Sequence, residues 1–143
     1  MDHRVTFSLL QAARAYRVRS ARLLARVGLY PGQDALLKLL EDGPKTMGEA
    51  ATLLSIQPPT VTKMVNRLAA AGLVRTEVLD RDRRKVAVSM TDAARDRIEE
   101  IDTIWQELEK EALVDVEPEP LRAGLAALAR NLSKHNGRAS KSN

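Results

Sequence analysis

Cysteine is absent from this sequence of 143 residues, and aromatic side chains make up only 3% of it. Without a thiol, the chain holds no disulfide framework, thiolate zinc site, cysteine nucleophile or thiol redox switch. Only His3 and His135 supply an imidazole, and both lie near the ends of the sequence. A catalytic or metal centre built on histidine is therefore poorly supplied, and we expect neither a metal ion nor a cofactor.

Long hydrophobic runs are also missing. No apolar stretch approaches the roughly 18 residues of a membrane span, and the first residues lack the uninterrupted apolar segment of a secretory signal peptide. With 44% apolar and 29% charged residues, the composition is that of a globular domain. We therefore expect a soluble, cytoplasmic protein that buries its own core.

Charge is distributed unevenly along the chain, whose net charge is +4. Residues 55–91 carry seven basic and three acidic side chains, whereas residues 92–120 carry three basic and eleven acidic ones. This asymmetry indicates two surfaces with different partners. A basic excess suits nucleic acid, although many basic proteins bind none.

Periodicity and turn residues predict a mainly helical chain with one pair of strands. Segments 73–79 and 85–90 are rich in valine and leucine and are expected to form the strands. Residues 136–143 are polar and are expected to form a flexible tail. Helices are expected over residues 4–27, 34–42, 47–54, 58–72, 92–114 and 119–135.

Several residues mark the helix ends. Thr46 and Glu49 have the spacing of a capping box, and Pro58 is suited to a first helical position because its missing N–H needs no partner there. Gly72 is expected to end its helix in the left-handed conformation. Thr91 is expected to cap the long helix that follows.

The order of elements in residues 46–91 is that of a winged helix-turn-helix: a short helix, a tight link, a second helix and two strands. On a wheel of about 100° per residue, one side of the second helix is apolar and predicts a core-facing surface. That side carries Val61, Met64, Val65 and Leu68.

The other side of the second helix carries residue types that read DNA. Lysine and arginine donate to guanine, asparagine pairs with adenine, and threonine offers a hydroxyl or a methyl group. An ordinary solvated helix face is the alternative. With Thr60 included, the candidate DNA contacts are Pro59, Thr60, Thr62, Lys63, Asn66 and Arg67.

The tip between the two strands is strongly basic. Such a tip fits a narrow minor groove, where negative potential is concentrated. Asp82 or its neighbour Asp80 is interpreted as the partner of an arginine in an ion pair. The alternative is that the charges keep an exposed hairpin soluble and protect a sheet edge. The basic candidates are Arg81, Arg83, Arg84 and Lys85.

These residues resemble those of MarR-type transcriptional regulators. The segment GPKTMGEAATLLSIQPPTVTKMVNRLAAAGLVRTEVLDRDRRKVAVSMT (residues 43–91) is similar to the winged helix-turn-helix of that family. Its wing has the family's Asp-x-Arg, five intervening residues, an apolar residue and a threonine, here Asp82, Arg84, Met90 and Thr91. The flanking helices extend the resemblance over nearly the whole chain.

The resemblance implies a winged helix-turn-helix over 31–91, flanked by dimerisation helices in 1–30 and 92–135. It implies a homodimer that binds double-stranded DNA, with residues 58–71 in the major groove and Arg84 in the minor groove. A repressor acting on a pseudo-palindromic operator is the expected form. Gln57 departs from the family, which often has a capping serine or threonine there.

The family's usual effector is a small organic anion held between the winged domain and the dimerisation helices. The aromatic candidates for such a site are Tyr16, Tyr30 and Trp105, with Arg17, Arg14 or Arg22 as a carboxylate partner. The alternative for Tyr16 and Trp105 is a place in the dimer core, because both lie on apolar seams.

A winged helix that docks on a protein partner without binding specific DNA is the main alternative, and an acidic or apolar recognition face would favour it. An enzyme is not expected, because the sequence has no glycine-rich phosphate loop, no nucleophile with a partnering histidine and no HExxH spacing.

Overall fold

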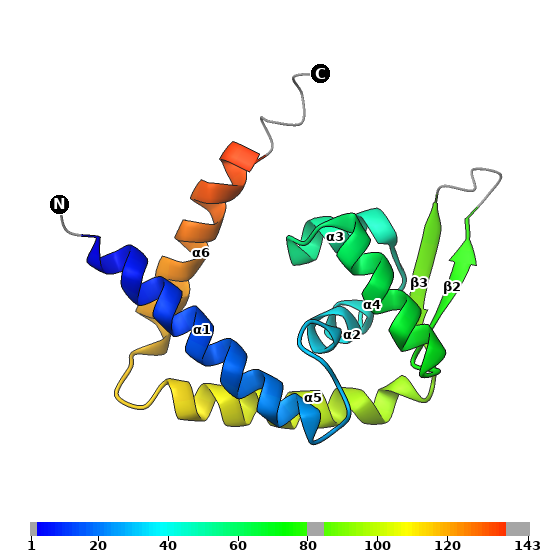
Figure 1. The fold of residues 1–143 in the computed structure, drawn as a ribbon, viewed down its shortest axis with the longest axis horizontal. Coiled ribbons are helices and arrows are strands. Elements are labelled where there is room, and N and C mark those ends of the chain that lie inside the picture. The colour runs from blue at the N-terminus through cyan, green and yellow to red at the C-terminus, as the bar shows by residue number, and fades with distance from the viewer. Residues whose placement is uncertain (1–2, 80–84, 137–143) are drawn as a thin grey trace. The chain divides into compact units, whose positions relative to one another are not determined.

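The computed structural model describes residues 3–79 and 85–136, with the side chains of 135 and 136 left out. It is mainly helical with a small three-stranded sheet, which confirms the predicted fold class. Within the described ranges, no helix is long and apolar enough to cross a membrane. The elements are α1 (Arg4–Ala25), α2 (Gln33–Leu40), β1 (Lys45–Thr46), α3 (Met47–Leu54), α4 (Pro58–Ala70), β2 (Val74–Val78), β3 (Val86–Met90), α5 (Ala94–Ala112) and α6 (Pro118–Asn136) (Figure 1).

The chain forms two compact units, Met1–Leu108 and Glu109–Asn143. The core of the first unit draws side chains from α1, α2, α4, β3 and α5. It therefore continues past residues 31 and 91, the limits predicted for the winged domain. The largest side chains that are fully buried are Leu23, Leu24, Leu36, Leu37, Val61, Val65, Leu68, Val88 and Ile101.

The sheet has the order β1-β3-β2, and both pairs are antiparallel. Val88 at the centre of β3 pairs with Lys45 on one side and Thr76 on the other. Its side chain is buried in the hydrophobic core. β1 was not predicted, because two residues are too few to show the alternation that marks a strand. The long pair β2–β3 forms the wing (Figure 1).

Most of the predicted helix ends are confirmed. The hydroxyl oxygen of Thr46 accepts a hydrogen bond from the backbone N–H of Glu49 at 3.1 Å, as a capping residue does. Pro58 is the first residue of α4, and Gly72 follows the helix with φ +75°. Glycine suits that conformation because it has no Cβ to clash.

The predicted capping role of Thr91 is wrong. Its hydroxyl donates to the carbonyl oxygen of Gly72 at 2.6 Å, and its N–H donates to the carbonyl of Leu73 at 3.1 Å. These bonds tie the end of β3 to the link between α4 and β2. α5 begins at Ala94, two residues after the predicted start.

In the second unit, α6 exposes a row of leucines. Leu121, Leu125, Leu128 and Leu132 are spaced by three or four residues, so they lie on one side of the helix. All four are exposed. Of the predicted tail, residues 137–143 lie outside the described part of the chain, while Asn136 is the last residue of α6.

Candidate nucleic-acid interface

α3 and α4 form a helix-turn-helix, and its short link is held by the backbone. Ser55 ends α3 in the left-handed conformation, with φ 54°. The N–H of Ile56 then donates to the carbonyl of Ala51 at 3.1 Å. Gln57 is the N-cap residue of α4 and makes no side-chain capping hydrogen bond there. The first turn of α4 therefore begins without a side-chain cap, as expected from the departure of Gln57 from the family pattern.

α4 has one apolar and one polar side, as the helical wheel predicts. Val61, Val65 and Leu68 are buried in the core, and Met64 is half-buried. This burial holds α4 firmly against the rest of the unit. All six candidate DNA contacts on the opposite side are exposed: Pro59, Thr60, Thr62, Lys63, Asn66 and Arg67.

Two of these outward side chains have described contacts. The hydroxyl of Thr62 donates to the carbonyl oxygen of Pro58 at 3.1 Å, one helical turn back. The guanidinium carbon of Arg67 lies 5.9 Å from the centre of the Tyr30 ring, within the range of a cation–π contact. The face of α4 is thus polar and basic, and Arg67 is partly oriented before any DNA arrives.

The turn before α2 lies against this helix and encloses a hollow of about 320 Å³. Of the effector candidates named from the sequence, Tyr30 lines this hollow and the others do not. Lys63 and Arg67 give the hollow positive charge. Its lining is Tyr30, Pro31, Gly32, Gln33, Ile56, Thr60, Lys63, Met64 and Arg67.

Trp105 lies on α5 and contacts α2. Its indole N–H donates to Oδ2 of Asp34 at 3.0 Å, and the ammonium of Lys38 lies 6.0 Å from the centre of its ring. Lys38 also pairs with Asp102 at 2.7 Å and with Glu41 at 2.6 Å. The hydrogen bond to Asp102, and then that to Glu41, raises the pKa of Lys38 above its usual value.

The contact between Asp34 and α5 is not predictable from the sequence. An acidic residue at the start of a helix is typical of N-terminal capping and dipole effects. Its contact with Trp105 joins residues 71 positions apart, and no local pattern predicts a pairing at that distance. The one sequence signal for this contact is that the charged residue Asp34 directly precedes the apolar residues of α2.

Both strands of the wing are described, up to Leu79 on one side and from Lys85 on the other. Leu79 and Lys85 flank the tip, and the N–H of Leu79 donates to the carbonyl of Lys85 at 2.9 Å. Lys85 is exposed and borders a hollow of about 380 Å³ together with the first residues of α3. The candidates Arg81, Asp82, Arg83 and Arg84 lie outside the described residues.

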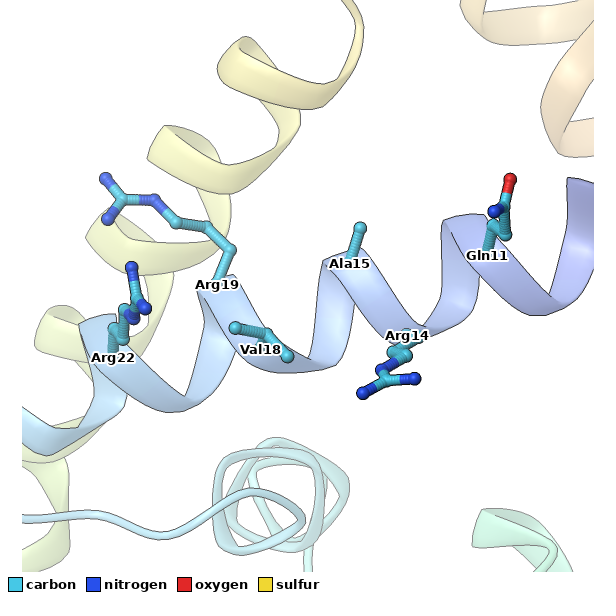
Figure 2. Close-up of a pocket in the computed structure, with 6 residues that line it drawn as sticks. All are labelled: Gln11, Arg14, Ala15, Val18, Arg19 and Arg22. Atoms are coloured by element: carbon cyan, nitrogen blue, oxygen red, sulfur yellow. The ribbon is translucent and has the colours of Figure 1, made fainter.

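The remaining effector candidates, Tyr16 and Arg17, are exposed on α1. A hollow of about 470 Å³ lies along the same helix. Figure 2 shows the residues that line it: Gln11, Arg14, Ala15, Val18, Arg19 and Arg22. Arg14 and Arg22 thus border a common surface, while neither Tyr16 nor Arg17 lines it. Arg19 is turned toward α5, where its guanidinium lies 4.0 Å from Glu107.

Within the described ranges, no group of three or more histidine and acidic side chains is placed to hold a metal ion. His3 precedes α1 and is exposed, and the side chain of His135 is not described. The helix-turn-helix face remains the principal candidate site.

Comparison with known proteins decides the family. Residues 28–85 match the MarR family, and these residues contain α2, the helix-turn-helix and β2, the first strand of the wing. Over 114 residues the chain is 32% identical to the HTH-type transcriptional regulator YwoH of Bacillus subtilis, covering 79% of this chain and 82% of YwoH. The chain belongs to the MarR family.

Solved structures of other proteins share the fold over almost the whole chain. BpsR of Bordetella bronchiseptica, whose DNA binding is regulated by 6-hydroxynicotinic acid, has a TM-score of 0.78 and 23% identity, covering 92% of this chain and 94% of BpsR. MepR of S. aureus, solved in complex with DNA, has a TM-score of 0.78 and 20% identity, covering 93% and 99%. These two structures show that the chain has the winged-helix fold. The family match and the relative YwoH make this MarR family member a DNA-binding transcriptional regulator.

Proposed function

We propose that this MarR family protein is a homodimeric repressor, not an enzyme, that binds a pseudo-palindromic operator in the cytoplasm. In each protomer, residues 58–71 enter the major groove and the wing tip enters the minor groove. The observation that carries the proposal is the face of α4: six polar, basic or proline side chains stay exposed, while the other side of the helix is anchored in the core.

The chemistry of that face favours DNA over a protein partner. Lys63 and Arg67 supply positive charge, and Asn66 supplies an amide that pairs with adenine in the major groove. The described part of the face carries no acidic side chain and no large apolar one. Docking on a protein would be favoured by an acidic or apolar surface, so specific DNA binding is the better supported function.

Dimerisation through residues 1–30 and 92–135 is proposed from exposed apolar side chains. Val5, Phe7 and Leu10 are exposed on the first half of α1, and α6 exposes its row of leucines. Apolar rows of this length are usually covered in a soluble protein. A second copy of the chain is the simplest cover, and it places two recognition helices on one operator.

We propose that the wing contacts DNA through Arg81, Arg83, Arg84 and Lys85, with Asp82 orienting one of the arginines. Support comes from the pairing of β2 with β3, which extends to Val78 and Val86, and from the N–H of Leu79, which donates to the carbonyl of Lys85. The sequence between Leu79 and Lys85 includes three arginines.

A small aromatic or anionic effector is proposed to modulate DNA binding, as 6-hydroxynicotinic acid does for BpsR. The hollow beside Tyr30 is suited to an aromatic anion, because it is lined by an aromatic ring and two basic side chains. Tyr16, Arg17 and Trp105 stay proposed contacts. An effector acts only if its affinity differs between two arrangements of the protein.

The test is fluorescence anisotropy of the purified protein on a library of duplexes at two salt concentrations. We expect one enriched palindrome, bound as one dimer per duplex, with affinity falling steeply as salt rises because phosphate contacts release counterions. Binding without sequence preference at both salt concentrations would contradict the proposal.

Replacing Asn66 by alanine is expected to change the preferred operator more than the total affinity. An asparagine that pairs with adenine contributes roughly 1–3 kcal/mol of discrimination against other bases. The check is selection on a duplex library with the wild type and Asn66→Ala in parallel. An equal weakening on all sequences would assign Asn66 to a phosphate contact.

Replacing Arg84 by alanine is expected to weaken operator binding by a few kcal/mol at most, with the fold intact. Anisotropy measures the affinity and thermal unfolding checks the fold. Arg95→Ala on α5 is a matched control, because this arginine is exposed at the start of α5 and pairs with Asp92. An unchanged affinity of Arg84→Ala would remove the wing from the mechanism.

A further inference from the structure

Asp34 is a buried carboxylate at the start of α2, and both of its oxygens accept hydrogen bonds. Oδ1 accepts from the backbone N–H of Gly32 at 3.0 Å, and Oδ2 accepts from the indole N–H of Trp105 at 3.0 Å. The residue is 8% exposed. Because a buried carboxylate that loses a donor is left incompletely solvated, each of these bonds constrains Asp34. The carboxylate therefore joins the turn before α2 to α5.

The same turn packs against the recognition helix. Gly32 has φ +96°, and a Cβ at this position would lie 3.0 Å from Sδ of Met64 on α4. Tyr30, two residues earlier, places its ring beside the guanidinium of Arg67. The turn is also held from within, since the N–H of Tyr30 donates to Oε1 of Gln33 at 2.9 Å. A shift of the turn would therefore move contacts on both the buried and the outer side of α4.

We propose that Asp34 is a positioning residue for DNA recognition, which sets the orientation of α4 and Arg67 by holding residues 30–32 against Trp105 of α5. The proposal rests on the DNA-binding function proposed above. Asp34 itself touches no DNA, because it is buried beneath the turn. Its effect passes through the close contact between Gly32 and Met64 and through the ring of Tyr30.

Lys38 offers a matched control on the same pair of helices. It joins α2 to α5 through Asp102 and lies against the ring of Trp105. Its described partners do not include residues 30–32. Lys38→Met therefore weakens the contact between α2 and α5 without releasing the turn. If DNA recognition depended only on the general packing of α2 on α5, changes at Lys38 and at Asp34 would both lower it. If it depends on the link from Asp34 to residues 30–32, the change at Lys38 will not.

The test compares two conservative variants with this control. Trp105→Phe removes the indole N–H but keeps an aromatic ring, and Asp34→Asn keeps the side-chain volume but leaves a single acceptor oxygen. Anisotropy measures the affinity for operator and for unrelated DNA, at a temperature where thermal unfolding shows every variant to be folded. We expect the ratio of the two affinities to fall at least about fivefold in both variants, the lower end of energetic coupling between sites. Lys38→Met should keep the wild-type ratio.

A double-mutant cycle separates positioning from a structural role. If the contact between Asp34 and Trp105 acts through Arg67, the losses of DNA specificity in Trp105→Phe and Arg67→Ala will not add. The first change already disturbs the contact that the second removes. Additive losses, an unchanged ratio in Trp105→Phe, or an equal loss in Lys38→Met would each overturn the proposal. If one conservative variant does not fold, the other decides. A wild type that prefers no sequence would instead refute the proposed DNA function, and this inference with it.

Discussion

Replacing Leu68 by alanine is expected to lower the free energy of unfolding by about 2–5 kcal/mol, since the change deletes a buried side chain and leaves a cavity. Leu68 is 1% exposed and lies on the inner side of α4. It is part of the same core as α1, α2 and α5, so its loss loosens the anchor of the recognition helix. Urea titration followed by circular dichroism measures the change.

Leu53→Ala is the control for this experiment. Leu53 lies on α3 in the same unit and is 58% exposed, so the same chemical change there should alter the free energy of unfolding by less than about 0.5 kcal/mol. Operator affinity of Leu68→Ala, measured well below its midpoint, should also fall because α4 is less firmly held. A midpoint equal to that of the wild type would show that α4 is not held by this core.

The helix-turn-helix was predictable because its signals are local. Thr46 and Glu49 mark the start of α3 within four residues, and the wheel of α4 separates Val65 from Asn66 with no knowledge of the rest of the chain. Burial of the first and exposure of the second confirm that separation. A helix that packs on one side must show this period, so the fold class followed from the sequence.

The errors and omissions concern contacts between distant residues. Threonine favours helix capping, yet the hydroxyl of Thr91 donates a hydrogen bond to the carbonyl of Gly72, 19 positions away. Asp34 likewise has the residue type and position of a helix start. Its hydrogen bond with Trp105 depends on how α5 packs on α2. The contact of Tyr30 with Arg67 of α4 also joins residues far apart in the sequence and was not predicted. Tertiary packing decides these cases, and one sequence carries no record of it.

Replacing Leu125 by glutamate is expected to dissociate the proposed dimer and to lower operator affinity by two to four orders of magnitude. Leu125 is central in the exposed leucine row of α6, and a charge there would be buried without a partner on assembly. Separate protomers lose the gain that comes from joining two half-site contacts, roughly 10²–10⁴ in affinity. Sedimentation velocity measures the assembly, and anisotropy measures the binding.

Ala123→Glu is the matched control, because it adds the same charge to the opposite side of α6 at an exposed position. This variant should stay dimeric and bind the operator as the wild type does. The two measurements also test each other. A monomeric Leu125→Glu with full operator affinity would show that one winged domain suffices for recognition. A dimeric Leu125→Glu would place the interface on another surface, with the apolar side chains of α1 as the next to be changed.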